Sequence, residues 1–319
     1  MPGENPGFVT LTVQDLDAGR HDAFGRAVGN ILSTEIALET YAQIIDGLPL
    51  SDVAWDRYRH KLHPKHPIDS HRELCPGALE KAEEMREVFN INILRIDADL
   101  WLLELTAVAL HEISVYLFQK GDCVHDLHHT SESSQTIKYV TEWQRPPDDW
   151  LPIMSWPTLF THPGFTAVEQ YPNSVADIVG YWAEDRILGG VTLFDHSRTW
   201  GADDEPNIYF QSSRPKQTYR IYQLLDDQQQ RLLDFLALSI KRDTSEPCPL
   251  PLSYSSDNTV RIDPNEAISV YKVYRDPWER VERRIPESRR QFIRDRDVLS
   301  ASDHPGLEEQ LQELLRRST

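Results

Sequence analysis

The sequence has few of the residues on which secreted, disulfide-stabilised proteins depend. Its 319 residues include three cysteines, Cys75, Cys123 and Cys248, which are far apart and form no C-x-x-C pair. An odd, scattered set argues against a disulfide framework and favours a reducing compartment. The first residues, MPGENPGFVTLTVQDLDAG, have neither the basic start nor the apolar run of a secretory signal. We therefore expect a cytoplasmic protein.

Long hydrophobic runs are also missing. The longest apolar stretch, from Leu100 to Phe118, is interrupted by Glu104, His111 and Glu112. A membrane span needs about 20 predominantly apolar residues. The stretch therefore predicts a buried helix of a globular protein, and no membrane association is expected.

Positive charge is scarce. Lys and Arg number 33 against 51 Asp and Glu, which gives a formal net charge of −18. Such a chain repels a phosphate backbone, so we expect no binding to nucleic acid. One segment differs, because residues 275–296 hold eight Arg against five acids. We interpret it as a solvated helical face with i,i+4 ion pairs such as Glu279–Arg283. The alternative is an interaction surface, which would suit a homo-oligomer.

The motifs of the common enzyme classes are absent. We find no Walker A loop, no GxGxxG after a strand, no GxSxG elbow, no HExxH and no kinase signature. Nucleotide-binding enzymes, common hydrolases and zinc proteases are therefore disfavoured. The sequence assigns no cofactor.

The pattern of apolar residues predicts an α+β fold. A helical N-terminal layer, residues 15–130, is expected to pack on a mostly antiparallel sheet in a strand-rich part, 176–262. Residues 131–175 form an irregular segment rich in aromatics and proline, and 263–319 a helical C-terminal end. No flexible linker separates these parts, so residues 1–319 are predicted to form a single integrated unit.

Local signals refine the second half. Residues 176–188 and 191–197 predict a hairpin with Gly189 and Gly190 at its turn, and 207–213 with 217–225 predict a second pair of strands. Three Asp residues with Glu or Gln three positions later predict helix starts, namely Asp226, Asp263 and Asp276.

Ionisable residues lie on one stripe of the predicted helix near 97–118. The stripe consists of Asp97, Trp101, Glu104, Val108, His111, Val115 and Phe118. A buried carboxylate or imidazole needs a partner or a shifted pKa. His111 and Glu104 are therefore candidate catalytic groups for acid–base chemistry. The alternative is that they form hydrogen bonds between helices in a satisfied core. A di-iron site is disfavoured, because Ala107 stands where the pattern requires His.

An aromatic and charged run is the candidate substrate-binding wall. Tyr181, Trp182, Asp185 and Arg186 fall in the first predicted strand. Aromatic walls with a few convergent charges suit a small organic ligand. A cross-strand ion pair over the sheet edge is the alternative.

Histidines are concentrated in one region. Eight of the 12 lie between 60 and 129, beside Cys75 and Cys123. The segments HKLHPKHPIDSH and CVHDLHH flank the long helical region and could meet in space, where zinc would accept such ligands. Their spacing matches no zinc pattern, so solvated loop histidines are the favoured interpretation and we assign no metal ligand.

Residues 171–197, 206–214 and 274–280 are similar to a group of uncharacterised proteins encoded in filamentous-fungal genomes, for which no activity is established. The resemblance implies a non-secreted protein and a lineage-restricted role such as specialised metabolism. The function we expect is an enzyme acting on a small organic molecule by acid–base chemistry. The alternatives are a non-catalytic interaction or assembly protein, and a metal-binding protein that uses the His-rich region 60–129.

Overall fold

The structure is a computed structural model that describes residues 13, 16–58, 66–94, 102–121, 123–124, 157–197, 207–214, 217–238, 247–280 and 316. Its α-helices are α1 (Ala18–Leu32), α2 (Glu35–Asp46), α3 (Ser51–Tyr58), α4 (Ala78–Val88), α5 (Leu102–Lys120), α8 (Val175–Leu188) and α9 (Asp226–Ala237). Short turns are η2 (Pro67–Ser70), η3 (Ile91–Ile93), η4 (Val168–Gln170) and the π-helical η5 (Ala267–Tyr271). The strands are β1 (Val191–Asp195), β2 (Ile208–Gln211), β3 (Ile221–Gln223), β4 (Arg261–Ile262) and β5 (Val273–Tyr274).

The first two helices begin at capped residues. The side chain of Asp17 accepts a hydrogen bond from the backbone N–H of Arg20, and that of Thr34 accepts one from Ala37. The Thr34 cap starts α2 as a helix separate from α1. Gly47 ends α2 with a φ of 100°, a left-handed conformation that glycine adopts without strain.

Helix α5 is the central helix of the core. Among the described helices it alone has the length and hydropathy of a membrane span, and 67% of its apolar window is buried. It packs against α1, α2 and α8. The apolar stretch around Glu104 and His111 is therefore the buried helix that the sequence predicts.

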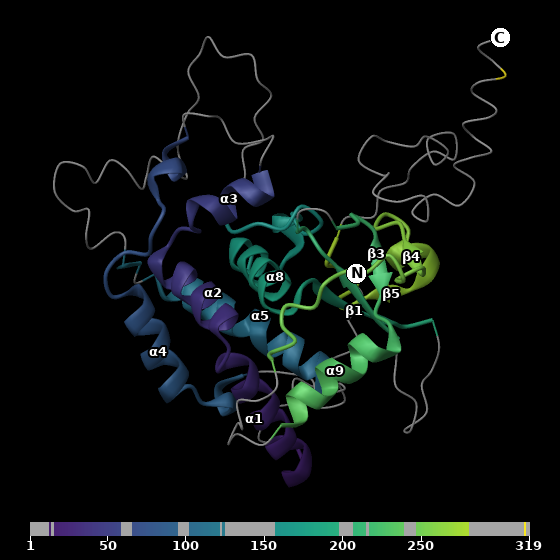
Figure 1. The fold of residues 1–319 in the computed structure, drawn as a ribbon, viewed down its shortest axis with the longest axis horizontal. Coiled ribbons are helices and arrows are strands. Elements are labelled where there is room, and N and C mark those ends of the chain that lie inside the picture. Colours follow the sequence, from purple (N-terminus) through teal and green to yellow (C-terminus); the bar gives the residue numbers. More distant parts are fainter. Residues whose placement is uncertain are drawn as a thin grey trace, which may run out of the picture.

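The five strands form one antiparallel sheet in the order β4-β3-β2-β1-β5. Helix α8 packs on β1 and on α5, so it lies between the helical layer and the sheet (Figure 1). The largest hydrophobic cluster draws side chains from α1, α5, α8, the sheet and α9. The predicted α+β fold, a helical layer on an antiparallel sheet, is confirmed.

The prediction of a strand over residues 176–188 is wrong, because this segment is helix α8. Twelve of its 14 residues are buried, so no polar face reveals a helical period. Gly189 is not a hairpin turn. It ends α8 with a φ of 107°, and a Cβ there would lie 2.0 Å from the carbonyl oxygen of Leu252.

Other expectations for the second half are confirmed in part. Residues 191–195 form β1, and β2 pairs with β3 as predicted. The N-cap of α9 is Leu225, one residue before the predicted cap Asp226, and its backbone N–H donates to the side chain of Gln228. Asp263 is followed by a turn and the π-helical η5. The predicted helical end beyond residue 280 and most of the irregular segment 131–175 lie outside the described residues.

Candidate functional site

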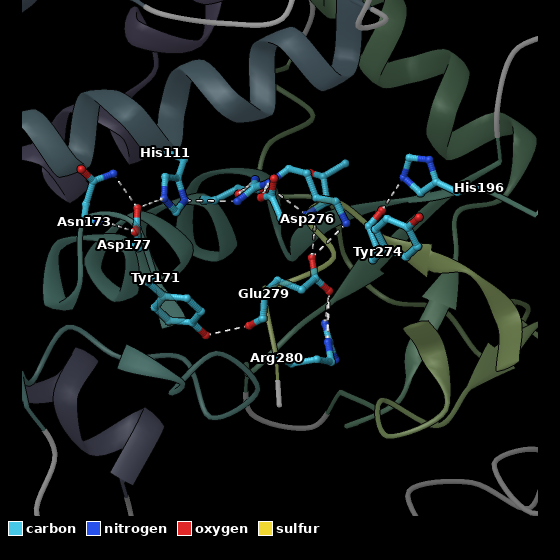
Figure 2. A network of polar contacts seen from close by, with 12 residues as sticks. His111, Tyr171, Asn173, Asp177, His196, Tyr274, Asp276, Glu279 and Arg280 are labelled. Carbon is cyan, nitrogen blue, oxygen red and sulfur yellow. Dashed lines mark hydrogen bonds and ion pairs between the residues drawn. The ribbon is translucent and has the colours of Figure 1, made fainter. Parts of the chain in front are cut away.

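A buried polar network joins the helical layer to the sheet. We call it the central network; its members are His111 of α5, Asp177 and Glu184 of α8, and Arg275, Glu279 and Arg280 after β5. Figure 2 shows four of them, His111, Asp177, Glu279 and Arg280, converging from three parts of the chain. All of them are buried except Arg280, which is of intermediate exposure.

His111 uses both ring nitrogens. Its Nε2 lies 2.9 Å from Oδ1 of Asp177, and a guanidinium nitrogen of Arg275 lies 3.2 Å from its Nδ1. A guanidinium can only donate, so Nδ1 accepts and Nε2 carries the proton given to Asp177. The network therefore fixes one tautomer of a neutral imidazole.

Asp177 is held as a carboxylate. Burial by itself raises its pKa, but the hydrogen bond from His111 and those from Asn173 bring the pKa below its ordinary value. The backbone N–H of Asn173 donates to Oδ2 at 2.7 Å, and its side-chain amide donates to Oδ1 at 3.1 Å.

Arg275 and Glu184 form the most buried ion pair of the network. A guanidinium nitrogen lies 2.5 Å from Oε2 of Glu184, and the side chains are 4% and 0% exposed. The other carboxylate oxygen accepts the backbone N–H of Thr192 on β1 at 2.6 Å. The Arg275 guanidinium also sits 4.9 Å from the ring centre of Tyr181. The pair thus connects α8, β1 and the segment after β5.

Glu279 organises the turn after β5. Its Oε2 accepts the backbone N–H groups of Arg275 and Asp276, and its Oε1 accepts two donors from Arg280. Burial raises the pKa of Glu279, and the charge of Arg280 opposes that rise. The predicted helix start at Asp276 is wrong for the described residues, because residues 276–280 form a turn that Glu279 closes.

The interpretation of 275–296 as a solvated face is wrong for its first residues. Arg275 and Arg280 pair with buried carboxylates, since a buried Glu requires a cation close by. Arg280 additionally donates to Gln211 of β2 and lies over Phe165. Arg283 and the remainder of the segment lie outside the described residues.

The four predicted substrate-binding residues do not form one wall. They lie on a helix and not on a strand, so their side chains point in different directions. Tyr181 contacts His111 edge-on, with ring centres 4.6 Å apart. Trp182 packs against Phe160, and Arg186 lies over the Trp182 ring. Asp185 accepts the hydroxyl of Ser213 at 2.8 Å. Of the expected binding wall, only Tyr181 therefore joins the candidate catalytic residue His111.

Glu104 is buried on α5, seven residues before His111. Seven residues of helix rise about 10.5 Å, so the two side chains do not meet along this helix. A nearer carboxyl group is that of Glu112, which is half-buried; burial raises its pKa, partly offset by His111. The ligating atoms of His111, Glu112 and Asp177 lie within 4.8 Å of one another. Because the Arg275 cation faces His111, this group does not fit a metal ion.

A second polar cluster lies at the end of α2. We call it the Asp–His–Cys cluster; it consists of Asp46, His71 and Cys75, whose ligating atoms also lie within 4.8 Å of one another. His71 and Cys75 belong to the His-rich region, and Val124 packs against Cys75. Most of the two flanking segments, 60–71 and 123–129, lies outside the described residues, so their approach stays a prediction.

A groove of about 570 Å³ opens between α2, α4 and α5. These helices lie side by side in Figure 1. Its lining comprises Ile44, Ile45, Lys81, Glu84, Met85, Val88, Phe89, Asn90, Tyr116, Leu117, Lys120 and Cys123. Val88 and Tyr116 are 79% and 52% exposed, so part of the apolar wall faces solvent.

Sequence reasoning singled out His111, His71 and Cys75, but it did not identify Asp177 and Glu184 of the central network or Asp46 as site residues. The sequence does contain a signal for Asp177 and Glu184. They are carboxylates in an otherwise apolar segment, which indicates buried groups that need partners. Asp46, directly before Gly47, offers no comparable signal. Comparison of the chain with protein families, curated proteins and solved structures finds no match.

Proposed function

We propose that this protein binds a small amphipathic organic molecule in the groove between α2, α4 and α5. The observation that carries the proposal is the groove itself, whose volume of about 570 Å³ falls within the range of small-molecule sites. Its walls are mostly apolar and come from helix faces that belong to the core. A hydrocarbon body is therefore the part of the ligand that the groove suits best.

Charge at the groove favours an anionic head group. Lys81 and Lys120 line it together with one acid, Glu84, in a chain whose net charge is −18. A local excess of cations attracts an anion, while the apolar wall selects against small hydrated ions. The ligand class we propose is an organic carboxylate with an aliphatic chain.

Catalysis on such a ligand stays a prediction. Among the described residues, the lining of the groove includes neither His111 nor Glu104. An acid–base role for His111 also requires Arg275 to leave Nδ1, because that nitrogen is otherwise occupied. A place in specialised metabolism would suit the ligand class and likewise stays a prediction.

Binding of dansyl-labelled undecanoate, followed by its fluorescence, tests the proposal. We expect saturable binding that dodecanoate competes for and dodecyltrimethylammonium does not. Lys120→Glu should weaken binding about fivefold, since an exposed ion pair contributes up to about 1 kcal/mol. Lys272→Glu makes the same charge change at an exposed residue outside the groove and should leave the affinity unchanged.

A second variant tests the apolar wall. Met85→Trp places a larger side chain in the groove and should abolish probe binding while the circular dichroism spectrum is retained. The proposal is wrong if the probe does not saturate, or if Lys120→Glu and Lys272→Glu behave alike and Met85→Trp still binds.

A further inference from the structure

The Asp–His–Cys cluster brings three different donor atoms to the C-terminal end of α2. Asp46 is the last residue of the helix and has no exposed surface. His71 and Cys75 follow η2 and are 8% and 9% exposed. The cluster therefore brings an oxygen, a nitrogen and a sulfur atom together in a site that is almost excluded from solvent. A charged group in such a site needs an opposite charge close by.

The contacts of the two His71 ring nitrogens determine which protonation states the cluster can have. Its Nδ1 lies 3.1 Å from the carbonyl oxygen of Pro49, which can only accept, so Nδ1 carries a proton. Its Nε2 faces Oδ2 of Asp46, also at 3.1 Å. Either Nε2 is protonated as well and His71 is an imidazolium, or Nε2 is bare and a cation lies between it and the carboxylate. Metal-binding histidines usually donate their other N–H to a carbonyl or carboxylate in this way.

The environment of Cys75 argues against a reactive nucleophile. Burial and the neighbouring Asp46 carboxylate raise the pKa of the Cys75 thiol to about 12. Nucleophilic cysteines need a lowered pKa and a cationic surrounding. Cys75 therefore keeps its proton unless a stronger Lewis acid displaces it.

The end of α2 is electrostatically suited to a cation. The carbonyl groups at a helix C-terminus carry a partial negative charge, and Asp46 is the final helical residue. Burial raises the pKa of Asp46, but the bonds from His71 and from the N–H of Cys75 bring the pKa below its ordinary value. Oδ2 of Asp46 also accepts the backbone N–H of Cys75 at 3.0 Å, which holds the carboxylate towards the other two donor atoms.

We propose that Asp46, His71 and Cys75 bind a zinc-type divalent ion with water in the fourth position. Zinc accepts this mixed oxygen, nitrogen and sulfur set, whereas magnesium and calcium prefer oxygen ligands alone. Around tetrahedral zinc the nitrogen and oxygen ligands lie about 3.3 Å apart, close to the 3.1 Å between His71 and Asp46. On binding, the S–H bond of Cys75 and the N–H bond at Nε2 of His71 break, metal–sulfur and metal–nitrogen bonds form, and both protons pass to solvent.

The bound ion would link His71 and Cys75, which follow η2, to Asp46 at the end of α2, close to the groove. Ile45, which directly precedes Asp46, lines the groove, and Cys123 of the groove lies against Gly47. The site is nevertheless independent of the groove ligand, because its three donors are not groove-lining residues. Metal binding and amphiphile binding can therefore be tested separately.

Cobalt(II) titration of the untagged, chelator-treated protein tests the site without any substitution. We expect one equivalent to produce a thiolate-to-metal charge-transfer band and tetrahedral visible bands, and zinc to remove both. The melting temperature should rise with zinc in proportion to the logarithm of its free concentration. A protein that shows no charge-transfer band and no zinc-dependent rise would overturn the proposal.

Variants identify the ligands. Cys75→Ser should remove the charge-transfer band, and His71→Gln should weaken zinc binding by more than about 100-fold, the upper range for outer-shell groups. Cys248→Ser is the thiol control, since that cysteine is exposed, and should retain the band. If Cys75→Ser retains the band, the ligand assignment is wrong. If either variant fails to fold, the cobalt spectrum of the unsubstituted protein still decides.

Discussion

At the residue scale, buried charges in this protein are explained by partners far away in the sequence. Glu184 and Asp177 are visible in the sequence as carboxylates in an apolar segment, which indicates that each needs a cation or a donor. Their partners cannot be read from the sequence, because Arg275 lies 91 residues after Glu184. The prediction that His111 lies on a buried helix is confirmed, while its tautomer depends on that distant guanidinium.

Arg275→Met tests the strength of the buried pair. Removing the guanidinium leaves Glu184 buried without its cation, so the free energy of unfolding should fall by about 3–5 kcal/mol. Chemical denaturation of the variant measures this loss. Adding Glu184→Gln to Arg275→Met should recover part of the stability, because the uncompensated charge disappears.

The control for this prediction is the exposed pair of Arg231 and Asp227 on α9. Arg231→Met should lower the free energy of unfolding by less than about 1 kcal/mol. Equal losses in Arg231→Met and Arg275→Met would contradict the buried-pair explanation.

At the element scale, the sequence distinguishes elements with one solvated face better than fully buried ones. Strands β2 and β3 are predicted correctly, since turn residues separate two short apolar runs. Helix α8 is missed because its apolar residues surround it on all sides, and Tyr, Trp and Val favour a strand by propensity. Burial against α5, α2 and β1 overrides that propensity.

Gly180→Ala tests the close approach of α8 to α5. A Cβ at Gly180 would lie 2.6 Å from the His111 ring, which is held in place by Asp177 and Arg275. The variant should lose about 1–3 kcal/mol of stability through overpacking, despite the higher helix propensity of alanine. Thermal or chemical denaturation measures the loss.

Gly29→Ala provides the matched control, because Gly29 lies within α1 and no atom would come within 4 Å of an added Cβ. This variant should gain up to about 1 kcal/mol from helix propensity alone. Stabilisation of both glycine variants would show that the α5–α8 contact is looser than described.

At the scale of the whole molecule, acid should loosen the junction between the helical layer and the sheet. Folded Asp177 has a lowered pKa, so the unfolded chain binds more protons as the pH falls through the carboxylate range near 4. The stability that Asp177 contributes is present above that range and is lost as the pH falls through its folded pKa. Asp177→Asn should therefore be less stable than the unsubstituted protein at pH 6, and the difference should narrow towards pH 3.

Asp227→Asn is the comparison, since its carboxylate is exposed. Urea denaturation across this pH series measures the free energy of unfolding of each variant relative to the unsubstituted protein. The loss should depend on pH for Asp177→Asn and should be small at every pH for Asp227→Asn. A constant difference for Asp177→Asn would mean that the contribution is steric and not ionic.

The position of Arg275 along the chain also affects how the protein folds as it is made. The ribosome adds about 5–20 residues per second, so Arg275 is synthesised about 5–18 s after Glu184. During that interval α8 carries Glu184 without its guanidinium, and burying that carboxylate unpaired is costly. The nascent helical layer would therefore remain open to chaperones until the segment after β5 emerges and closes it.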